Sequence, residues 1–139
     1  YFIHGLPGQT VETAASTVAL IERLYELGVE KVTVYRFRPL PGSAFEGMRE
    51  GPPARRDRAS SMIERAAREF NMARKRQMVD RVLEAVYSGS SYRGLPVLYP
   101  LGEGPVMVSA ERLRMKPGES IKVKVLRAVS DRMLLVRPT

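Results

Sequence analysis

The 139-residue chain contains no cysteine, no tryptophan and only one histidine. Without cysteine it can form no disulfide framework and can hold no metal through thiolates, which excludes a disulfide-stabilised secreted scaffold. No apolar run approaches the roughly 18 residues that a membrane span needs. The first residues also lack the basic segment and the apolar core of a secretory signal. We therefore predict a cytoplasmic protein without a membrane partner.

Acidic residues are scarce relative to basic ones, with 15 Asp and Glu against 23 Lys and Arg and a formal net charge of +8. The excess is uneven along the chain. Residues 1–47 hold four basic and five acidic side chains, residues 48–88 hold ten and six, and residues 89–139 hold nine and four, so the segments carry −1, +4 and +5. Such a balance favours a polyanionic partner, most often nucleic acid. The solubility of an arginine-rich protein would explain it equally well.

The first 37 residues have the pattern of a β-α-β unit. Tyr1–Ile3 predicts a strand, Thr10 is a favourable N-cap for a helix over Val11–Leu27, and Val29–Phe37 alternates like a second, parallel strand. Two glycines in the turn Gly5–Gly8 allow a close approach of the backbone, and such a turn at a helix start is where α/β proteins place anionic or nucleotide-like ligands. A tight turn without a ligand is the alternative.

Two strands are too few for a stable sheet. We therefore expect further strands that precede Tyr1 in a longer protein, and the absence of an initiator methionine favours this expectation. Homo-oligomerisation through the exposed sheet edges of residues 1–47 is the other way in which the sheet would be completed.

Residues 48–88 predict a helical connector. After a polar linker at residues 45–53, apolar side chains recur at three- and four-residue spacing from Ala54 to Val86, with arginines on the other faces. Such a helix would be about 45 Å long, unless the polar segment Arg74–Gln77 divides it into two. The arginines predict a solvated face, with RNA contact as the alternative.

A β-rich segment follows. Ser88–Ser91 predicts a flexible joint, after which the apolar period changes to two, as in strands. Four strands are predicted, at Gly94–Pro100, Gly104–Ser109, Ser120–Ala128 and Arg132–Arg137. Short strands at this density favour a small closed β-barrel of the oligonucleotide-binding kind. The predicted class is α/β plus all-β, with domains at residues 1–47, 48–88 and 89–139.

Two motifs in the first segment resemble the last part of a radical S-adenosylmethionine (SAM) domain. They are Ile3-His-Gly-Leu-Pro-Gly-Gln-Thr10 and Arg38-Pro-Leu-Pro-Gly-Ser-Ala44. In radical SAM methylthiotransferases a Gly-Phe-Pro-Gly-Glu-Thr segment stands at the first position and an Arg-Pro-Gly-Thr-x-Ala segment at the second. Leu6 and Gln9 depart from the first pattern, and Leu40 is an insertion in the second. The Leu-Pro-Gly-Gln-Thr form is also similar to the coproporphyrinogen-dehydrogenase-like branch of radical SAM enzymes.

The tail adds to the resemblance, because in the methylthiotransferases a long helical connector leads to a TRAM domain, a small RNA-binding β-barrel. The segments that resemble TRAM are Gly104-Pro-Val-Met-Val108, Lys116-Pro-Gly118 and Ile121-Lys-Val-Lys-Val125. The resemblance implies a partial radical SAM (β/α) barrel, a connector and an OB-like TRAM barrel. It also implies the C-terminal part of an RNA-modifying transferase, with tRNA as its partner.

The resemblance implies a cofactor site as well. SAM would be bound by Ile3, His4, Gly5, Leu6, Pro7, Gly8, Tyr35, Arg36 and Phe37. The three cysteines that hold the [4Fe–4S] cluster would lie upstream, so we expect this chain to be inactive alone and to supply no catalytic or metal-ligating residue. His4 is predicted to be a turn or packing residue, because no partner cluster accompanies it.

Phosphate contacts are predicted at basic side chains of the tail. They are Arg93, Arg112, Arg114, Lys116, Lys122, Lys124, Arg127 and Arg132. Tyr92 and Tyr99 would stack on bases or, alternatively, pack against the barrel. Two other functions stay open: a non-enzymatic basic RNA-binding protein that keeps the α/β unit as a scaffold, and a radical SAM enzyme that acts on a small molecule such as a tetrapyrrole.

Overall fold

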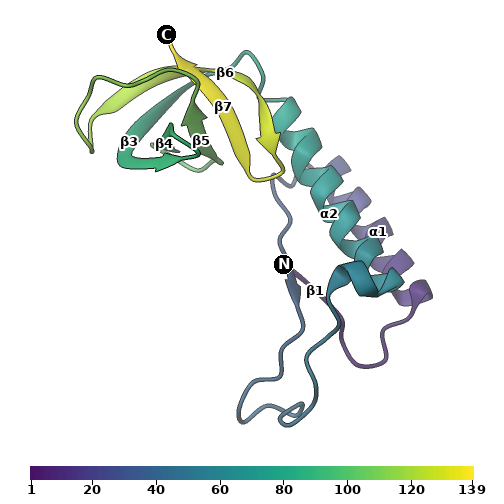
Figure 1. Ribbon diagram of the computed structural model, residues 1–139. Coiled ribbons are helices and arrows are strands. Elements are labelled where there is room, and N and C mark those ends of the chain that lie inside the picture. Colours follow the sequence, from purple (N-terminus) through teal and green to yellow (C-terminus); the bar gives the residue numbers. More distant parts are fainter. The chain divides into compact units, whose positions relative to one another are not determined.

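The computed structural model describes all 139 residues, which form two compact units, Tyr1–Asn71 and Met72–Thr139 (Figure 1). The first unit combines helices with a small sheet, and the second consists mainly of strands. The predicted mixed α/β class is therefore confirmed. Neither of the two α-helices combines the length and the apolar character that crossing a bilayer requires.

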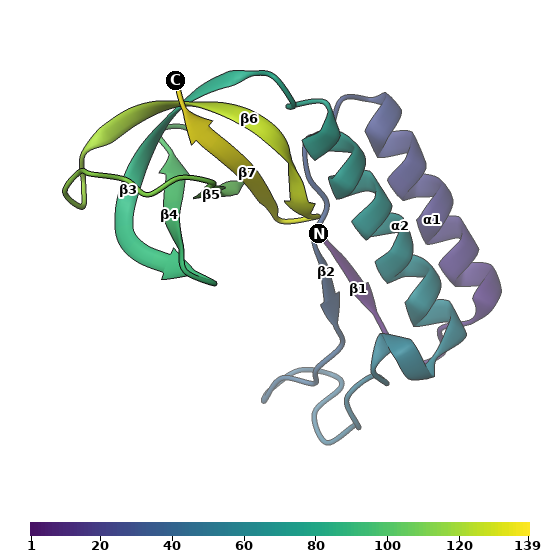
Figure 2. The ribbon, with the colours of Figure 1, turned by 45° about the horizontal axis from the view of Figure 1, so that its top comes forward.

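The first unit is a two-stranded sheet with two helices packed against it. Strands β1 (Phe2–His4) and β2 (Val34–Arg36) pair in parallel. Helices α1 (Val11–Glu26) and α2 (Arg58–Arg76) lie side by side, and a 3₁₀ turn, η1 (Ala54–Arg56), precedes α2 (Figure 2). The buried core of this unit is formed by Ala14, Ile21, Val32, Ala59, Ile63, Ala67 and Phe70.

Local chemistry sets both ends of α1. At its start the Thr10 Oγ1 atom accepts a hydrogen bond from the Thr13 backbone N–H (3.2 Å), and the Thr13 Oγ1 atom accepts one from the Thr10 N–H (2.9 Å). Just past its end Gly28 has a φ of 87°, which glycine adopts without strain, and its N–H donates to the Tyr25 carbonyl (3.1 Å). The predicted helix and its N-cap are confirmed.

The second strand is shorter than predicted, because Val32 does not join the sheet. Its backbone N–H donates to the Oδ1 atom of Asn71 (3.0 Å), and its carbonyl accepts from the Nδ2 atom of the same side chain (2.8 Å). Both residues are buried. A side chain of α2 thus satisfies the backbone groups that a neighbouring strand would otherwise pair, and β2 begins only at Val34.

The prediction of helical structure up to Val86 is wrong in its last part. Helix α2 ends at Arg76, and after a turn the chain enters strand β3 (Val82–Tyr92). The apolar residues at the start of β3 fit the spacing of a helix as well as that of a strand. The strand forms because β3 pairs with β4 along one edge and with β6 along the other. The predicted joint Ser88–Ser91 lies inside β3, so the domain boundary predicted there falls within a strand.

The second unit is a five-stranded barrel (Figure 1). Its strands after β3 are β4 (Leu95–Pro100), β5 (Val106–Ser109), β6 (Ser120–Ser130) and β7 (Met133–Pro138). They pair in the order β3-β4-β5-β7-β6, and β6 pairs back with β3, which closes the ring. All neighbours are antiparallel except β5 and β7. The four strands predicted after residue 91 all form.

Alternation along the strands fills the barrel with apolar side chains. On β6, Val123 and Val125 are fully buried, whereas Lys122 is exposed and Lys124 is partly exposed, as the period of two predicts. The buried interior is formed by Ala85, Leu98, Met107, Val123, Val125, Leu134 and Val136. The charged side chains of β6 are therefore carried on the outside of the barrel.

Candidate functional site

A small open pocket lies where β1 runs into α1. Its volume is about 250 Å³, and it is lined by one residue of β1, the segment between β1 and α1, the first half of α1 and one residue of α2. Four of the residues predicted to bind SAM belong to this lining: Ile3, Leu6, Pro7 and Gly8. The walls are mainly apolar, with the side chains of Thr13 and Thr17 on the helical side. Such a lining suits a flat or aliphatic group better than a phosphate.

The turn after β1 is shaped by a contact between two glycines. Gly5 has a φ of 78°, and a Cβ atom there would lie 2.9 Å from the Cα atom of Gly51. Gly51 is held by its N–H, which donates to the Phe37 carbonyl (3.0 Å), and by its carbonyl, which accepts from the Arg36 Nε atom. Gly8 has a similar φ of 80° but no neighbour within 4 Å of a Cβ atom. The predicted close approach at Gly5 is therefore to the chain itself, and Gly8 leaves the space open.

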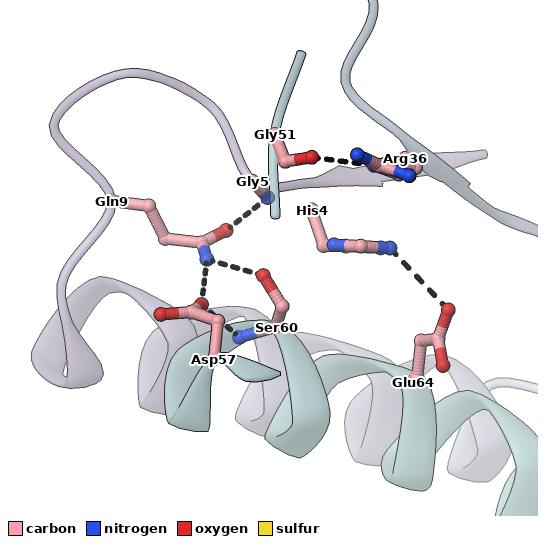
Figure 3. A network of polar contacts seen from close by, with 8 residues as sticks. All are labelled: His4, Gly5, Gln9, Arg36, Gly51, Asp57, Ser60 and Glu64. Atoms are coloured by element: carbon pink, nitrogen blue, oxygen red, sulfur yellow. Dashed lines mark hydrogen bonds and ion pairs between the residues drawn. The ribbon is translucent and has the colours of Figure 1, made fainter. Parts of the chain in front are cut away.

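Gln9 joins this turn to the start of α2 (Figure 3). Its Oε1 atom accepts from the Gly5 N–H (3.0 Å), and its Nε2 group donates to the Asp57 Oδ2 atom (3.3 Å) and to the Ser60 Oγ atom (3.1 Å). The Asp57 Oδ2 atom also accepts from the Ser60 backbone N–H (2.9 Å), which caps α2. A glutamate, as in the methylthiotransferase pattern, has no N–H to donate and would face Asp57 with a second carboxylate.

The Asp57 carboxylate makes the stability of this junction depend on pH. The Ser60 backbone N–H, followed by the Ser60 hydroxyl and the Gln9 amide, lowers the pKa of Asp57. A carboxyl group with a lowered folded pKa contributes stability above its unfolded pKa of about 4 and loses it as the pH falls through the folded value. Asp57→Ala should therefore reduce the free energy of unfolding by about 1 kcal/mol at neutral pH.

Urea unfolding of the wild type and of Asp57→Ala at several pH values measures this effect. The difference between the two proteins should shrink as the pH is lowered from about 5 to about 2. A difference that stays constant over this range would mean that the charge of Asp57 has no part in the junction.

His4 is buried beneath the turn and does not line the pocket. Its Nε2 atom lies 3.3 Å from the Glu64 Oε1 atom of α2 (Figure 3). Its Nδ1 atom is buried and has no hydrogen-bond partner. His4 and the buried Gly5, both predicted to bind SAM, are therefore not among the residues that line the pocket.

Tyr35 lies on the exposed side of the two-stranded sheet. It is opposite Ile3 in the parallel register, and both side chains are about half exposed, at 55% and 47%. The ring of Tyr1 stacks on it with centroids 5.8 Å apart. The exposed side of the sheet is thus apolar and aromatic. Ile3, which is on this side, also belongs to the pocket lining.

The other two residues predicted at the end of β2 are engaged within the chain. Arg36 forms an ion pair with Glu50 (3.4 Å) in addition to its bond to Gly51. Phe37 is buried, and its ring meets that of Phe45 edge to face, with centroids 5.5 Å apart. Neither side chain lines the pocket, so both hold the loop that follows β2 in place.

The predicted RNA contacts lie in two turns, one loop and one strand of the barrel. Two turns, β3–β4 and β6–β7, carry Arg93 and Arg132. The β5–β6 loop carries Arg112, Arg114 and Lys116, and strand β6 carries Lys122, Lys124 and Arg127. Lys124 pairs with Asp80 (2.9 Å), whereas the other seven cations form no ion pair. Arg93 lies over the ring of Tyr92, 5.4 Å from its centroid.

The β5–β6 loop is anchored on β3. The Tyr87 N–H donates to the Glu119 carbonyl (3.0 Å), and the Tyr87 carbonyl accepts from the Gly118 N–H (2.8 Å). Pro117 packs against Gly89, where an added Cβ atom would lie 2.7 Å from the proline ring. The three cations of the loop are therefore carried by a backbone that is fixed at its C-terminal end.

The two arginine-bearing turns lie at opposite ends of the β4–β5 pair. The Arg93 turn leads into the start of β4. The Arg132 turn leads into β7, whose Met133 pairs with Val106 at the start of β5. Because β4 and β5 are antiparallel, the start of β5 lies at the end of β4, where Tyr99 is 50% exposed.

The residues of this chain do not fit an iron–sulfur cluster. The chain has no cysteine, and no three His, Asp or Glu side chains lie together in a way that could hold a metal ion. The ligands of any such cluster would have to come from outside these residues.

No protein-family model matches the chain. Two archaeal proteins are similar to it: the uncharacterized protein MK0932 of Methanopyrus kandleri, 38% identical over 136 residues, and the uncharacterized protein MJ1620 of Methanocaldococcus jannaschii, 33% identical over 129 residues. The matches cover 96% and 92% of this chain but only 26% and 25% of those proteins. The chain thus spans about a quarter of the length of these curated relatives, and neither name states an activity.

Proposed function

We propose that this chain is the C-terminal part of an RNA-modifying radical SAM enzyme, with tRNA as substrate and methylthio transfer as the reaction. The observation that carries the proposal is the charge of the barrel. The second unit holds thirteen Lys and Arg against six Asp and Glu, whereas the first holds ten against nine, so the second unit carries +7 of the net +8. Nine of these cations, against five acidic residues, lie in residues 82–139, which form the barrel. A high charge with few ion pairs on a small, rigid β-fold suits a phosphate backbone.

The strand order of the barrel supports an oligonucleotide-binding barrel of the TRAM kind. Counted within the unit, the order is first, second, third, fifth and fourth, with the fourth strand paired to the first. In oligonucleotide-binding barrels the second and third strands and the turns 1–2 and 4–5 bind nucleic acid. These turns carry Arg93 and Arg132, and the exposed rings of Tyr92 and Tyr99 offer faces for base stacking.

The first unit would contribute part of the SAM site. The pocket lined by Ile3, Leu6, Pro7 and Gly8 offers apolar walls to the adenine or methionine part of the cofactor, and Tyr35 lies on the open sheet face beside Ile3. SAM held by a complete site would supply the reactive group. In this arrangement the residues of this chain would bind and orient SAM, and residues outside it would hold the iron–sulfur cluster.

The RNA half of the proposal is tested by the two arginine-bearing turns. Arg93→Gln with Arg132→Gln should weaken the binding of a labelled tRNA transcript about tenfold or more at physiological salt. The slope of log affinity against log salt should fall by about 1.5, because two phosphate contacts are lost. Fluorescence anisotropy over a salt series measures both quantities.

The matched control is Arg81→Gln with Arg137→Gln, which removes the same charge from the same barrel at residues outside the predicted set. Equal losses in the two double variants would show that net charge alone matters. Wild-type protein that binds no tRNA would overturn the proposal.

The enzymatic half is tested on the gene. An in-frame Cys-x-x-x-Cys-x-x-Cys loop encoded upstream of Tyr1 would support a radical SAM enzyme. A reading frame without such a loop would overturn this half and leave a basic RNA-binding module with an α/β scaffold.

A further inference from the structure

A row of arginines on α2 has no role in the arrangement above. Arg58, Arg65 and Arg68 are separated by seven and three residues, so they lie on one side of the helix. All three are exposed, on the side away from the buried apolar residues of α2. Two further exposed arginines precede them in η1. We call these five exposed arginines, at and just before the start of α2 and along one side of it, the arginine face: Arg55, Arg56, Arg58, Arg65 and Arg68.

None of the five arginines forms an ion pair, although acidic neighbours are within one helical turn. Glu64 precedes Arg68 by four residues, the spacing that favours a pair, but its carboxylate lies at His4 (3.3 Å). Glu69 follows Arg65 by four residues and pairs with nothing. Elsewhere in the same unit three other arginines do pair with a glutamate. The charge of the arginine face is thus not neutralised within the chain and is available to an anionic partner.

The arginines at the start of α2 also oppose the helix dipole. The N-terminal end of a helix is partly positive and favours acidic side chains. The first turn of α2 holds no acidic residue, Arg58 is its first residue, and Arg55 and Arg56 precede it in η1. Asp57 is the one carboxylate that offsets them. These arginines therefore do not help the helix to form, and an anionic partner would relieve their repulsion.

We propose that the arginine face is a second RNA-binding surface, on the first unit, which binds the phosphate backbone in addition to the contacts of the barrel. The inference rests on the proposed function for the identity of the partner. From Arg58 to Arg68 the helix rises about 15 Å, a length over which one nucleic-acid strand presents several phosphates. All five residues are arginine, whose guanidinium group binds phosphate oxygens bidentately.

The test is a triple variant, Arg58→Gln, Arg65→Gln and Arg68→Gln, in the full chain. Glutamine keeps the helix propensity of arginine, and circular dichroism checks that the helix is retained. Loss of three phosphate contacts should lower the salt slope of tRNA binding by about 2.4. A fourfold rise in salt, from about 50 to about 200 mM, should then weaken the wild type roughly 30-fold more than the variant.

The matched control removes three charges elsewhere in the first unit, through Arg23→Gln, Lys31→Gln and Arg49→Gln. Its salt slope should stay close to that of the wild type. A triple variant with the wild-type slope would overturn the inference, and so would an equal change in the control.

The failure of this inference can be told from the failure of the proposed function. If the barrel double variant loses tRNA affinity and the arginine-face variant does not, only the second surface is wrong. If the wild type binds no tRNA, both are wrong. Vesicles that contain phosphatidylserine are a second probe, because loss of vesicle binding with unchanged tRNA binding would assign the arginine face to a lipid surface and overturn the RNA contact.

Discussion

Replacing Gly51 by alanine should destabilise the first unit by about 3 kcal/mol. The new Cβ atom would lie 2.7 Å from the carbonyl oxygen of Gly5 and 2.8 Å from its Cα atom. Both are backbone atoms, which cannot move aside as a flexible side chain can. Urea unfolding measures the loss, and hydrogen exchange of peptides from the first unit assigns it to the turn after β1.

Two other glycines are controls for Gly51→Ala. Gly102→Ala adds the same methyl group where no atom lies within 4 Å, and should change stability by less than about 0.5 kcal/mol. Gly8→Ala meets no neighbour but has a positive φ, so it should cost about 1–2 kcal/mol through the backbone alone. If Gly51→Ala were no worse than Gly102→Ala, the contact between the two glycines would not exist in solution.

Asn71→Ala should destabilise the first unit by a similar amount. It removes one acceptor and one donor and leaves the N–H and the carbonyl of Val32 buried without their partners. Each unsatisfied buried group costs about 1–3 kcal/mol, so the sum is about 3 kcal/mol. Urea unfolding measures the loss, and faster hydrogen exchange at residues 29–34 should accompany it.

Asn71→Asp separates the hydrogen bonds from the volume of the side chain. The aspartate keeps an acceptor for the Val32 N–H but faces the Val32 carbonyl with a carboxylate oxygen, so we expect a loss of at least about 2 kcal/mol at neutral pH. An Asn71→Asp protein as stable as the wild type would show that the bond from Nδ2 to the Val32 carbonyl contributes nothing.

Elements whose ends are set by neighbours in the sequence could be predicted. Helix α1 begins at the cap of Thr10 and ends before Gly28, and both signals lie within a few residues of the helix. The start of β2 could not be predicted, because it depends on Asn71, which is 39 positions from Val32. The end of α2 could not be predicted for the same reason, since β3 is fixed as a strand by pairing with the distant β6.

In the candidate site, too, the features set by neighbouring residues could be predicted, and those set by distant residues could not. The motif after β1 indicated the residues that line the pocket, because glycine and proline mark a turn before a helix. The sequence did not indicate that Gly5 is needed for contact with Gly51, nor that Gln9 bonds to Asp57, 48 positions away. The one local signal for this junction is Asp57 three residues before Ser60, a spacing typical of a helix cap.

The closed ring of the barrel has a consequence for the order in which the two units fold during synthesis. The strand pairs that close the ring are distant in the sequence, because β3 pairs with β6, and β5 pairs with β7 (Met133–Pro138). Distant pairings of this kind form slowly. On the ribosome the chain emerges from its N-terminus, so residues 1–71 can form their contacts with one another before β7 emerges. The second unit, which carries nearly all of the net positive charge, is therefore expected to complete its folding last.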